Sequence, residues 1–83
     1  MDKSLSYLRE VLSNYLEDHE VSRHLYQKLS QKVYDDEKHF ARDLSEKEQS
    51  FLNKMLPHEI KHAMGEQDYV RVDQLNEVYE ELL

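Results

Sequence analysis

Apolar residues recur at helical spacing along nearly all of the 83-residue chain, and a single Gly and a single Pro do little to interrupt them. A first stripe with i, i+3, i+4, i+7 spacing consists of Leu5, Leu8, Leu12, Tyr15 and Leu16. It predicts a helix from about Lys3 to Glu17, with Asp2 or Ser4 as its N-cap. A second stripe consists of Val21, Leu25, Leu29 and Val33, with Tyr26 beside it. Because the two stripes fall roughly 160–200° apart around one continuous helix, we place a turn at residues 17–20.

Capping signals divide the second half of the chain. Asp35 and Asp36 predict a stop followed by a short helix through Phe40 and Leu44. Residues 45–48, S-E-K-E, form an S-x-x-E capping box ahead of a longer helix that we expect to end near Gly65. The apolar stripe of that helix consists of Phe51, Leu52, Met55, Leu56, Ile60, Ala63 and Met64. Pro57 lies inside it and predicts a kink or a break near Leu56.

The last helix is expected to begin after Asp68 and to run to the end of the chain. Its apolar residues are Tyr69, Val72, Leu75, Tyr79 and Leu82. The short link at residues 65–68 makes residues 45–83 a helical hairpin. The pattern therefore predicts an all-α fold: a small bundle of four helical segments with this C-terminal hairpin packed against the N-terminal helices, in a single helical domain over residues 1–83.

Composition narrows the classes of function. The chain has a net charge of −7, which opposes phosphate binding by the molecule as a whole, and it has no Cys, which excludes disulfides and thiolate zinc sites. No apolar run approaches the roughly 20 residues that span a bilayer. The N-terminal residues 1–10 enter a helical pattern rather than a signal peptide. We therefore expect a cytoplasmic protein with no membrane association.

The charges are unevenly placed. Residues 22–34 contain Arg23, Lys28 and Lys32 and no acid, whereas residues 66–83 contain six acids and one base. Two interpretations stay open: complementary solvated faces that orient the helices, or a docking surface for an oppositely charged partner. Tyr26 and Tyr34 beside the two lysines are the one place where aromatic and basic residues interleave, as they do in nucleic-acid binding sites.

Residues 58–62, His-Glu-Ile-Lys-His, match the H-E-x-x-H motif of zinc peptidases. On a helix, His58 and His62 share one face and could hold Zn²⁺, with Glu59 as general base and Glu77 or Glu80 as a third ligand. However, no strand pattern supplies a wall for a peptide substrate, Pro57 precedes the motif, and both histidines lie at the margin of the apolar arc. We therefore predict surface histidines here, with no catalytic residue, no metal ligand and no cofactor, and we do not expect an enzyme.

The remaining histidines, His19, His24 and His39, are predicted to be solvated. Tyr15, Tyr69 and Tyr79 lie on apolar stripes and are expected at the edge of the core, with their hydroxyls reaching water or a partner.

Sequence blocks near the two ends of the chain resemble those of a known protein family. The quoted blocks are S-Y-L-R-E-V-L-S-N-Y-L-E at residues 6–17, F-L-N at 51–53, E-I-K at 59–61, E-Q-D at 66–68 and L-N-E-V-Y-E at 75–80. Over about the first 17 and last 33 residues, the chain resembles the small Bacillus sigma-G-dependent sporulation-specific acid-soluble spore protein family. The resemblance implies expression in the forespore, soluble behaviour and no active site to transfer. The DNA-binding acid-soluble spore proteins are a different family, which this acidic chain does not resemble.

We therefore predict a non-enzymatic small helical protein of sporulating cells that binds or regulates a protein partner, or itself as a homodimer, through a helix face. A structural filler of the spore is the first alternative. A minimal zinc peptidase using residues 58–62 is the second, and direct DNA binding is the third.

Overall fold

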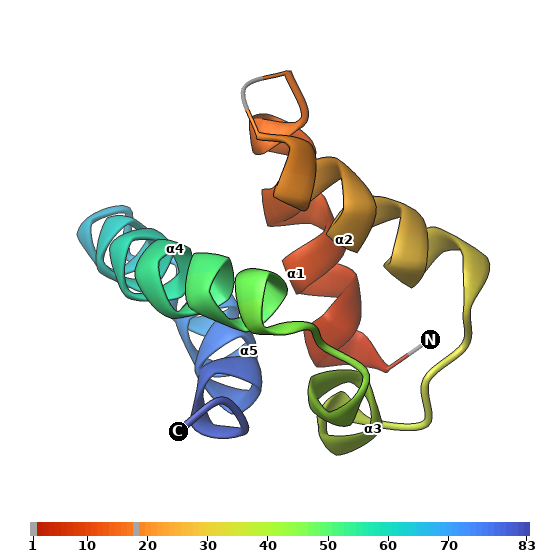
Figure 1. Ribbon diagram of the computed structural model, residues 1–83. Helices are drawn as coiled ribbons and strands as arrows, with labels where there is room; N and C mark the ends of the chain where they lie inside the picture. The colour runs from red at the N-terminus through yellow and green to blue at the C-terminus, as the bar shows by residue number, and fades with distance from the viewer. Residues whose placement is uncertain (1, 18) are drawn as a thin grey trace.

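The computed structural model describes residues 2–17 and 19–83, and this part of the chain forms helices and no strand (Figure 1). The elements in chain order are α1 Lys3–Leu12, the 3₁₀ turn η1 Ser13–Tyr15, α2 Glu20–Gln31, α3 Glu37–Arg42, α4 Glu46–Gly65 and α5 Tyr69–Glu80. The predicted all-α bundle is confirmed. With the six-residue α3 included, the described residues contain five α-helices.

The helices pack as two pairs that cross. α1 and α2 lie side by side, joined through η1, and α4 and α5 form the expected C-terminal hairpin (Figure 1). α5 packs on α1 and α4 packs on α2, so the hairpin covers the N-terminal pair as predicted. The short α3 closes the end of the bundle against α5.

One core lies where the pairs cross. Its fully buried side chains are Leu5, Leu8, Val11, Leu12, Leu25, Leu29, Phe40, Leu52, Leu56, Leu75 and Val78. Tyr34 packs edge-on against Phe40, with ring centroids 5.5 Å apart. Burial of such side chains contributes about 1.5–3 kcal/mol each, so these positions dominate the stability of the fold.

The first helix ends earlier than its apolar stripe predicts. Asp2 caps α1 by accepting from the Ser4 N–H, as expected, but α1 stops at Leu12 and not near Glu17. The Ser13 hydroxyl donates to the carbonyl of Glu10, and the chain continues as the η1 turn. Such local bonding by Ser competes with the helical ladder. The turn predicted at residues 17–20 falls partly on residue 18, outside the described residues; α2 begins at its last position.

The end of the second stripe was predicted wrongly. α2 ends at Gln31 because Lys32 adopts an extended backbone, and Val33 is therefore 85% exposed. The same extended segment carries Tyr34 into the core. Asp36 caps α3 as expected, yet α3 ends at Arg42, before Leu44.

The predicted capping box at the start of α4 is confirmed, but Pro57 does not break the helix. The Ser45 side chain accepts from the Glu48 N–H, and the Glu48 side chain accepts from the Ser45 N–H. α4 runs unbroken through Pro57 to Gly65. Pro57 and Asn53, whose carbonyl loses its helical partner to the proline, are both exposed, so water can solvate that carbonyl.

The hairpin turn differs from the expected glycine cap. Gly65 is still helical, and the left-handed residue is Gln67, with φ 59°. The Asp68 N–H then donates to the carbonyl of Ala63 at 2.9 Å, which closes the end of α4. Met64, placed on the core stripe by its spacing, is 55% exposed in this last turn.

The start of α5 is as predicted and its end is not. Asp68 accepts from the Arg71 N–H as N-cap, while the helix ends at Glu80 rather than at the end of the chain. Tyr69, expected at the core edge, is the first residue of α5 and is 60% exposed. Val78, which the stripe omitted, is fully buried.

Candidate functional site

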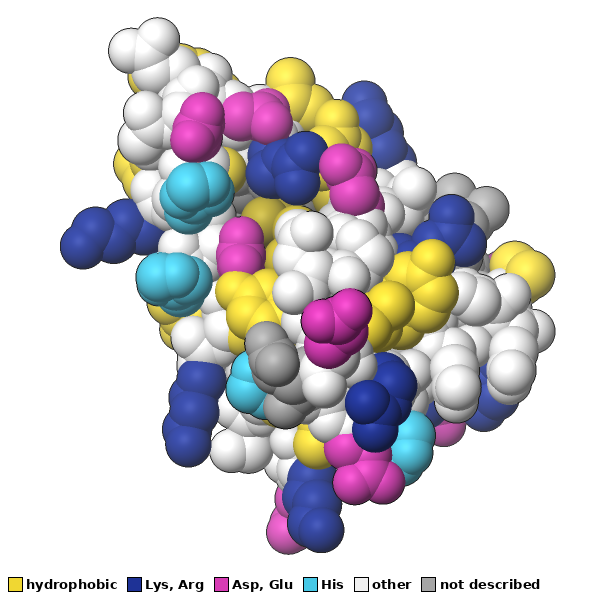
Figure 2. All heavy atoms as spheres, turned by 90° about the horizontal axis from the view of Figure 1, so that it is seen from above, with side chains coloured by type: hydrophobic (Ala, Val, Ile, Leu, Met, Phe, Trp, Pro, Cys, Tyr) yellow, Lys and Arg dark blue, Asp and Glu magenta, His cyan; other side chains and the backbone are white. Residues whose placement is uncertain are grey.

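The H-E-x-x-H segment lies on the outer side of α4, near the hairpin turn. His58 and His62 are both exposed and one helical turn apart. They line a hollow of about 460 Å³ between α4, the start of α5 and η1. Its other lining residues are Asn14, Glu59, Ala63, Glu66, Asp68 and Arg71. Figure 2 shows a face of the molecule on which histidine, acidic and basic side chains alternate, with hydrophobic side chains only in small separate patches.

Glu59, the residue that would act as general base, is held by a neighbour instead. The Tyr15 hydroxyl donates to its Oε1 atom, linking η1 to α4 across 44 residues of sequence. Burial, together with the hydrogen bond to Glu59 and its negative charge, raises the pKa of Tyr15 to about 12. Tyr15 also packs edge-on against Phe51 at 6.2 Å. In this arrangement Glu59 is a structural acceptor.

The proposed third ligands lie elsewhere. The Gln49 side chain donates to the Leu82 carbonyl at 3.2 Å, which places the end of α5 beside the start of α4. Glu77 and Glu80 are exposed on the last turns of α5, and neither lines the hollow beside the histidines. Among residues 2–17 and 19–83, no three metal-binding side chains converge on one point. The peptidase constellation is thus not assembled.

Arg71 lines the hollow and is held by contacts to two helices. Its guanidinium donates to Asp68 at 3.1 Å and to Glu10 at 3.2 Å, and it lies 5.8 Å from the centre of the Tyr7 ring. These bonds raise the pKa of Arg71, the Asp68 bond foremost, and hydrogen bonds from Arg71 hold the pKa of Asp68 below its ordinary value. Arg71 thereby ties the N-terminus of α5 to α1.

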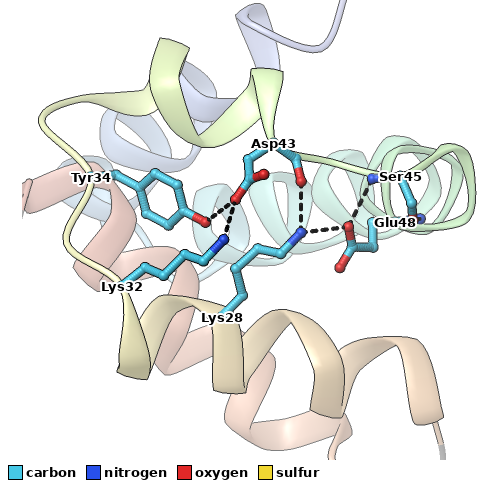
Figure 3. Close-up of polar contacts among 6 residues, drawn as sticks. All are labelled: Lys28, Lys32, Tyr34, Asp43, Ser45 and Glu48. Atoms are coloured by element: carbon cyan, nitrogen blue, oxygen red, sulfur yellow. Dashed lines mark hydrogen bonds and ion pairs between the residues drawn. The ribbon is translucent and has the colours of Figure 1, made fainter.

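A second polar cluster joins α2 to the loop between α3 and α4 (Figure 3). Lys28 Nζ donates to Glu48 Oε1 at 2.8 Å and to the Asp43 carbonyl at 2.7 Å, and the Ser45 N–H donates to the same Glu48 oxygen. Burial opposes ionisation of Glu48, but the bonds from Lys28 and Ser45 outweigh it and hold the pKa of Glu48 below its usual value. The Lys28 and Glu48 side chains are only 18% and 10% exposed. We call these contacts the α2–α4 clasp.

Lys32 and Tyr34 extend the clasp on the side nearer α3 (Figure 3). Both donate to Asp43 Oδ2, at 3.0 Å and 2.6 Å. The Tyr34 hydroxyl, followed by Lys32, lowers the pKa of Asp43. Burial, with the nearby Asp43 and Glu48 charges, raises the pKa of Tyr34. The lysines that suggested a basic docking segment are thus paired within the molecule, and Tyr34 is buried rather than displayed for stacking.

The other predicted histidines are exposed, each beside a partner. His24 lies 4.0 Å from Glu20, His39 lies 2.8 Å from Asp36, and the His19 ring lies 5.4 Å from that of Phe51. Sequence reasoning missed the Tyr15–Glu59 bond and the α2–α4 clasp. No short-range pattern indicates them, because the partners come from different helices.

The described residues therefore define a small helical-bundle protein whose polar clusters join one helix to another. None of the described helices is both long and apolar enough to cross a membrane. The family described as "CsgA: Minor curli fiber component A" matches residues 1–83. A "Sigma-G-dependent sporulation-specific SASP protein" of Bacillus subtilis (strain 168) is 52% identical over 83 residues, which cover all of both chains.

The chain belongs to the CsgA family so described, and its relationship to the Bacillus protein confirms the resemblance predicted from its terminal blocks. The words of the family description, which name a fibre component, carry no functional argument for this helical chain. No solved structure matches it significantly.

Proposed function

We propose that this protein acts in the forespore of sporulating cells as a non-enzymatic module that binds a basic partner protein through the outer face of α5. The printed name of its Bacillus relative, sigma-G-dependent and sporulation-specific, supports the cell type. The hydrogen bond from the Tyr15 hydroxyl to Glu59 supports a role other than peptide hydrolysis.

The outer face of α5 carries the proposal. It is a continuous exposed stripe at helical spacing, and its residues are Tyr69, Val70, Asp73, Asn76, Glu77 and Glu80. Three carboxylates and no base lie on it. Tyr69 and Val70 are 60% and 51% exposed at its N-terminal end.

The composition of this face indicates the chemistry of its partner. An exposed aromatic and aliphatic end supplies an apolar anchor, and the carboxylates beyond it attract Lys and Arg side chains. A partner segment with an apolar anchor followed by basic residues fits it. The alternative, a spore filler without a specific partner, does not require this arrangement of apolar and acidic residues along one helix face.

The test is affinity capture from lysate of sporulating Bacillus cells, followed by titration of the captured protein in purified form. We expect Glu77→Lys and Val70→Ser each to weaken binding at least about tenfold, because both remove a group from the binding face. The matched control is Asp35→Lys, the same change of charge on an exposed loop residue, which should bind as the unmodified protein does. Binding should also weaken between about 0.05 and 0.2 M salt, because the attraction between exposed charges is screened.

Three outcomes contradict the proposal. If no protein is retained, or if all three variants retain the same proteins, the outer face of α5 is not a binding surface and the filler interpretation gains. If the retained material is nucleic acid released by about 0.2 M salt, the DNA-binding alternative gains instead.

A further inference from the structure

The two histidines of the H-E-x-x-H segment keep the geometry of a metal chelate although the catalytic arrangement is absent. Because α4 continues unbroken through Pro57, His58 and His62 remain at i and i+4 on one helix. Side chains at that spacing have Cβ atoms about 5–6 Å apart, close enough for two imidazoles to bind one ion. Both rings are exposed, so no core packing opposes their rotation toward a shared ion.

A carboxylate extends this pair by another turn. Glu66 Oε1 lies 3.6 Å from His62 Nε2, and the His62 and Glu66 side chains are 68% and 66% exposed. Glu66, His62 and His58 all line the same hollow of about 460 Å³. Glu66 is eight residues from His58, about 12 Å along the helix, so it adds negative charge beside the histidine pair rather than a third ligand to the same ion. Among the described residues, no three metal-binding side chains converge.

The charge of the hollow favours a cation. With neutral histidines, its lining carries the carboxylates of Glu59, Glu66 and Asp68 against the single guanidinium of Arg71. Nitrogen ligands beside one carboxylate suit a borderline ion such as Zn²⁺, whereas Mg²⁺ and Ca²⁺ prefer all-oxygen sites.

We propose that His58 and His62 form a binding site for a divalent transition-metal ion of the Zn²⁺ class, with the Glu66 carboxylate one turn beyond them and water completing the coordination. The site is not hydrolytic, because Glu59 is bonded to Tyr15 and is not available to activate a bound water. Its position across the last two turns of α4 means that the ion would brace the helix next to the hairpin turn. This inference is independent of the α5 binding face.

The experiment is calorimetric titration of untagged protein with Zn²⁺ at neutral pH, with Mg²⁺ in parallel. We expect one saturable Zn²⁺ site, a loss of affinity of at least about tenfold in His58→Ala and in His62→Ala, and a loss of a few-fold in Glu66→Gln. His24→Ala is the matched control, an exposed histidine beside a glutamate on α2, and it should bind Zn²⁺ unchanged. Mg²⁺ should give no saturable signal.

Thermal unfolding supplies a second measurement. An ion that binds only the folded chain raises the midpoint, by roughly 5 °C or more at tenfold excess over the dissociation constant, and the two histidine variants should lose this shift. The proposal is overturned if Zn²⁺ gives no saturable site. It is equally overturned if His58→Ala and His62→Ala bind as His24→Ala does, or if Mg²⁺ competes on equal terms.

Discussion

The Lys28–Glu48 ion pair should contribute a measurable coupling energy to folding, unlike an ordinary surface pair. The two atoms are 2.8 Å apart and the side chains are 18% and 10% exposed. At an effective dielectric constant of about 20, the attraction at this distance is about 6 kcal/mol. Removing the two charges from water costs much of that, so we expect a net coupling of about 1–2 kcal/mol.

A double-mutant cycle with Lys28→Met and Glu48→Gln measures this energy. In Glu48→Gln the amide oxygen can still accept from the Ser45 N–H, so the capping box survives while the charge is lost. In Lys28→Met, Glu48 keeps that Ser45 bond but loses its counter-charge. Each single variant should be less stable by about 1–3 kcal/mol, and the double variant should lose less than the sum.

Urea unfolding followed by circular dichroism gives the four free energies of unfolding. A matched control is Lys32→Met, since the Lys32 side chain is 58% exposed although it pairs with Asp43 at 3.0 Å; its cost should stay within about 1 kcal/mol. A coupling below about 0.3 kcal/mol for Lys28 and Glu48 would refute the reasoning, because it would mean that water screens this pair as it screens a surface one.

The same cycle predicts a pH dependence with a definite sign. The folded pKa of Glu48 is lowered, so its contribution to stability is fully present above the ordinary glutamate pKa and is lost as the pH falls through the folded value. The difference in stability between the unmodified protein and Glu48→Gln should therefore shrink in acid. A difference that stays constant from neutral to strongly acidic pH would show that the charge of Glu48 is not what stabilises the clasp.

Four further predictions concern single residues. Gly65→Ala should stabilise the fold by about 0.5–1 kcal/mol, since Gly65 is helical and an added Cβ meets no atom within 4 Å. Gln67→Gly should stabilise the fold by about as much, because glycine adopts the positive φ of this position without strain. A lower urea midpoint of unfolding in either variant would contradict its prediction. Tyr15→Phe should lower the free energy of unfolding by about 0.5–1.5 kcal/mol at neutral pH, and an ultraviolet titration should lose the tyrosine that ionises near pH 12. Because the folded pKa is raised, the stability that the Tyr15 hydroxyl contributes is lost as the pH rises from about 10 toward 12. Leu29→Ala should cost about 2–5 kcal/mol while Val33→Ala stays within about 0.5 kcal/mol, and equal costs would show that α2 continues past Gln31.

Periodicity and capping residues predicted which segments are helical, and single residues decided where each helix ends. The capping residues Asp2, Asp36, Ser45 and Asp68 act as expected because a cap is a local bond between neighbours in sequence. Val33 fits the spacing of its stripe equally well, yet one extended residue before it turns it to solvent. A hydrophobic pattern predicts which face of a helix is buried but not how long the helix is, so the wrong predictions concern the residues at the helix ends.

The polar clusters could not be predicted for a different reason. Lys28 and Lys32 look like free positive charge when residues 22–34 are considered alone, and their partners Asp43 and Glu48 belong to another segment. A local excess of charge indicates a docking surface only where the charged side chains are not paired within the folded molecule. Because Lys28 and Lys32 on and after α2 are paired, the candidate surface for this chain is the outer face of α5 instead.

The H-E-x-x-H motif illustrates the same limit within five residues. The spacing of His58 and His62 is a property of the helix, so it is preserved once α4 is known to be continuous. The role of Glu59 is set by Tyr15, which lies 44 residues away and has no signature in the motif. Releasing Glu59 with Tyr15→Phe would free the carboxylate, but it would bring neither Glu77 nor Glu80 to the histidines. Metal binding and hydrolysis are therefore separable in this fold, and Tyr15→Phe should leave any Zn²⁺ affinity of the histidine pair intact without producing peptidase activity.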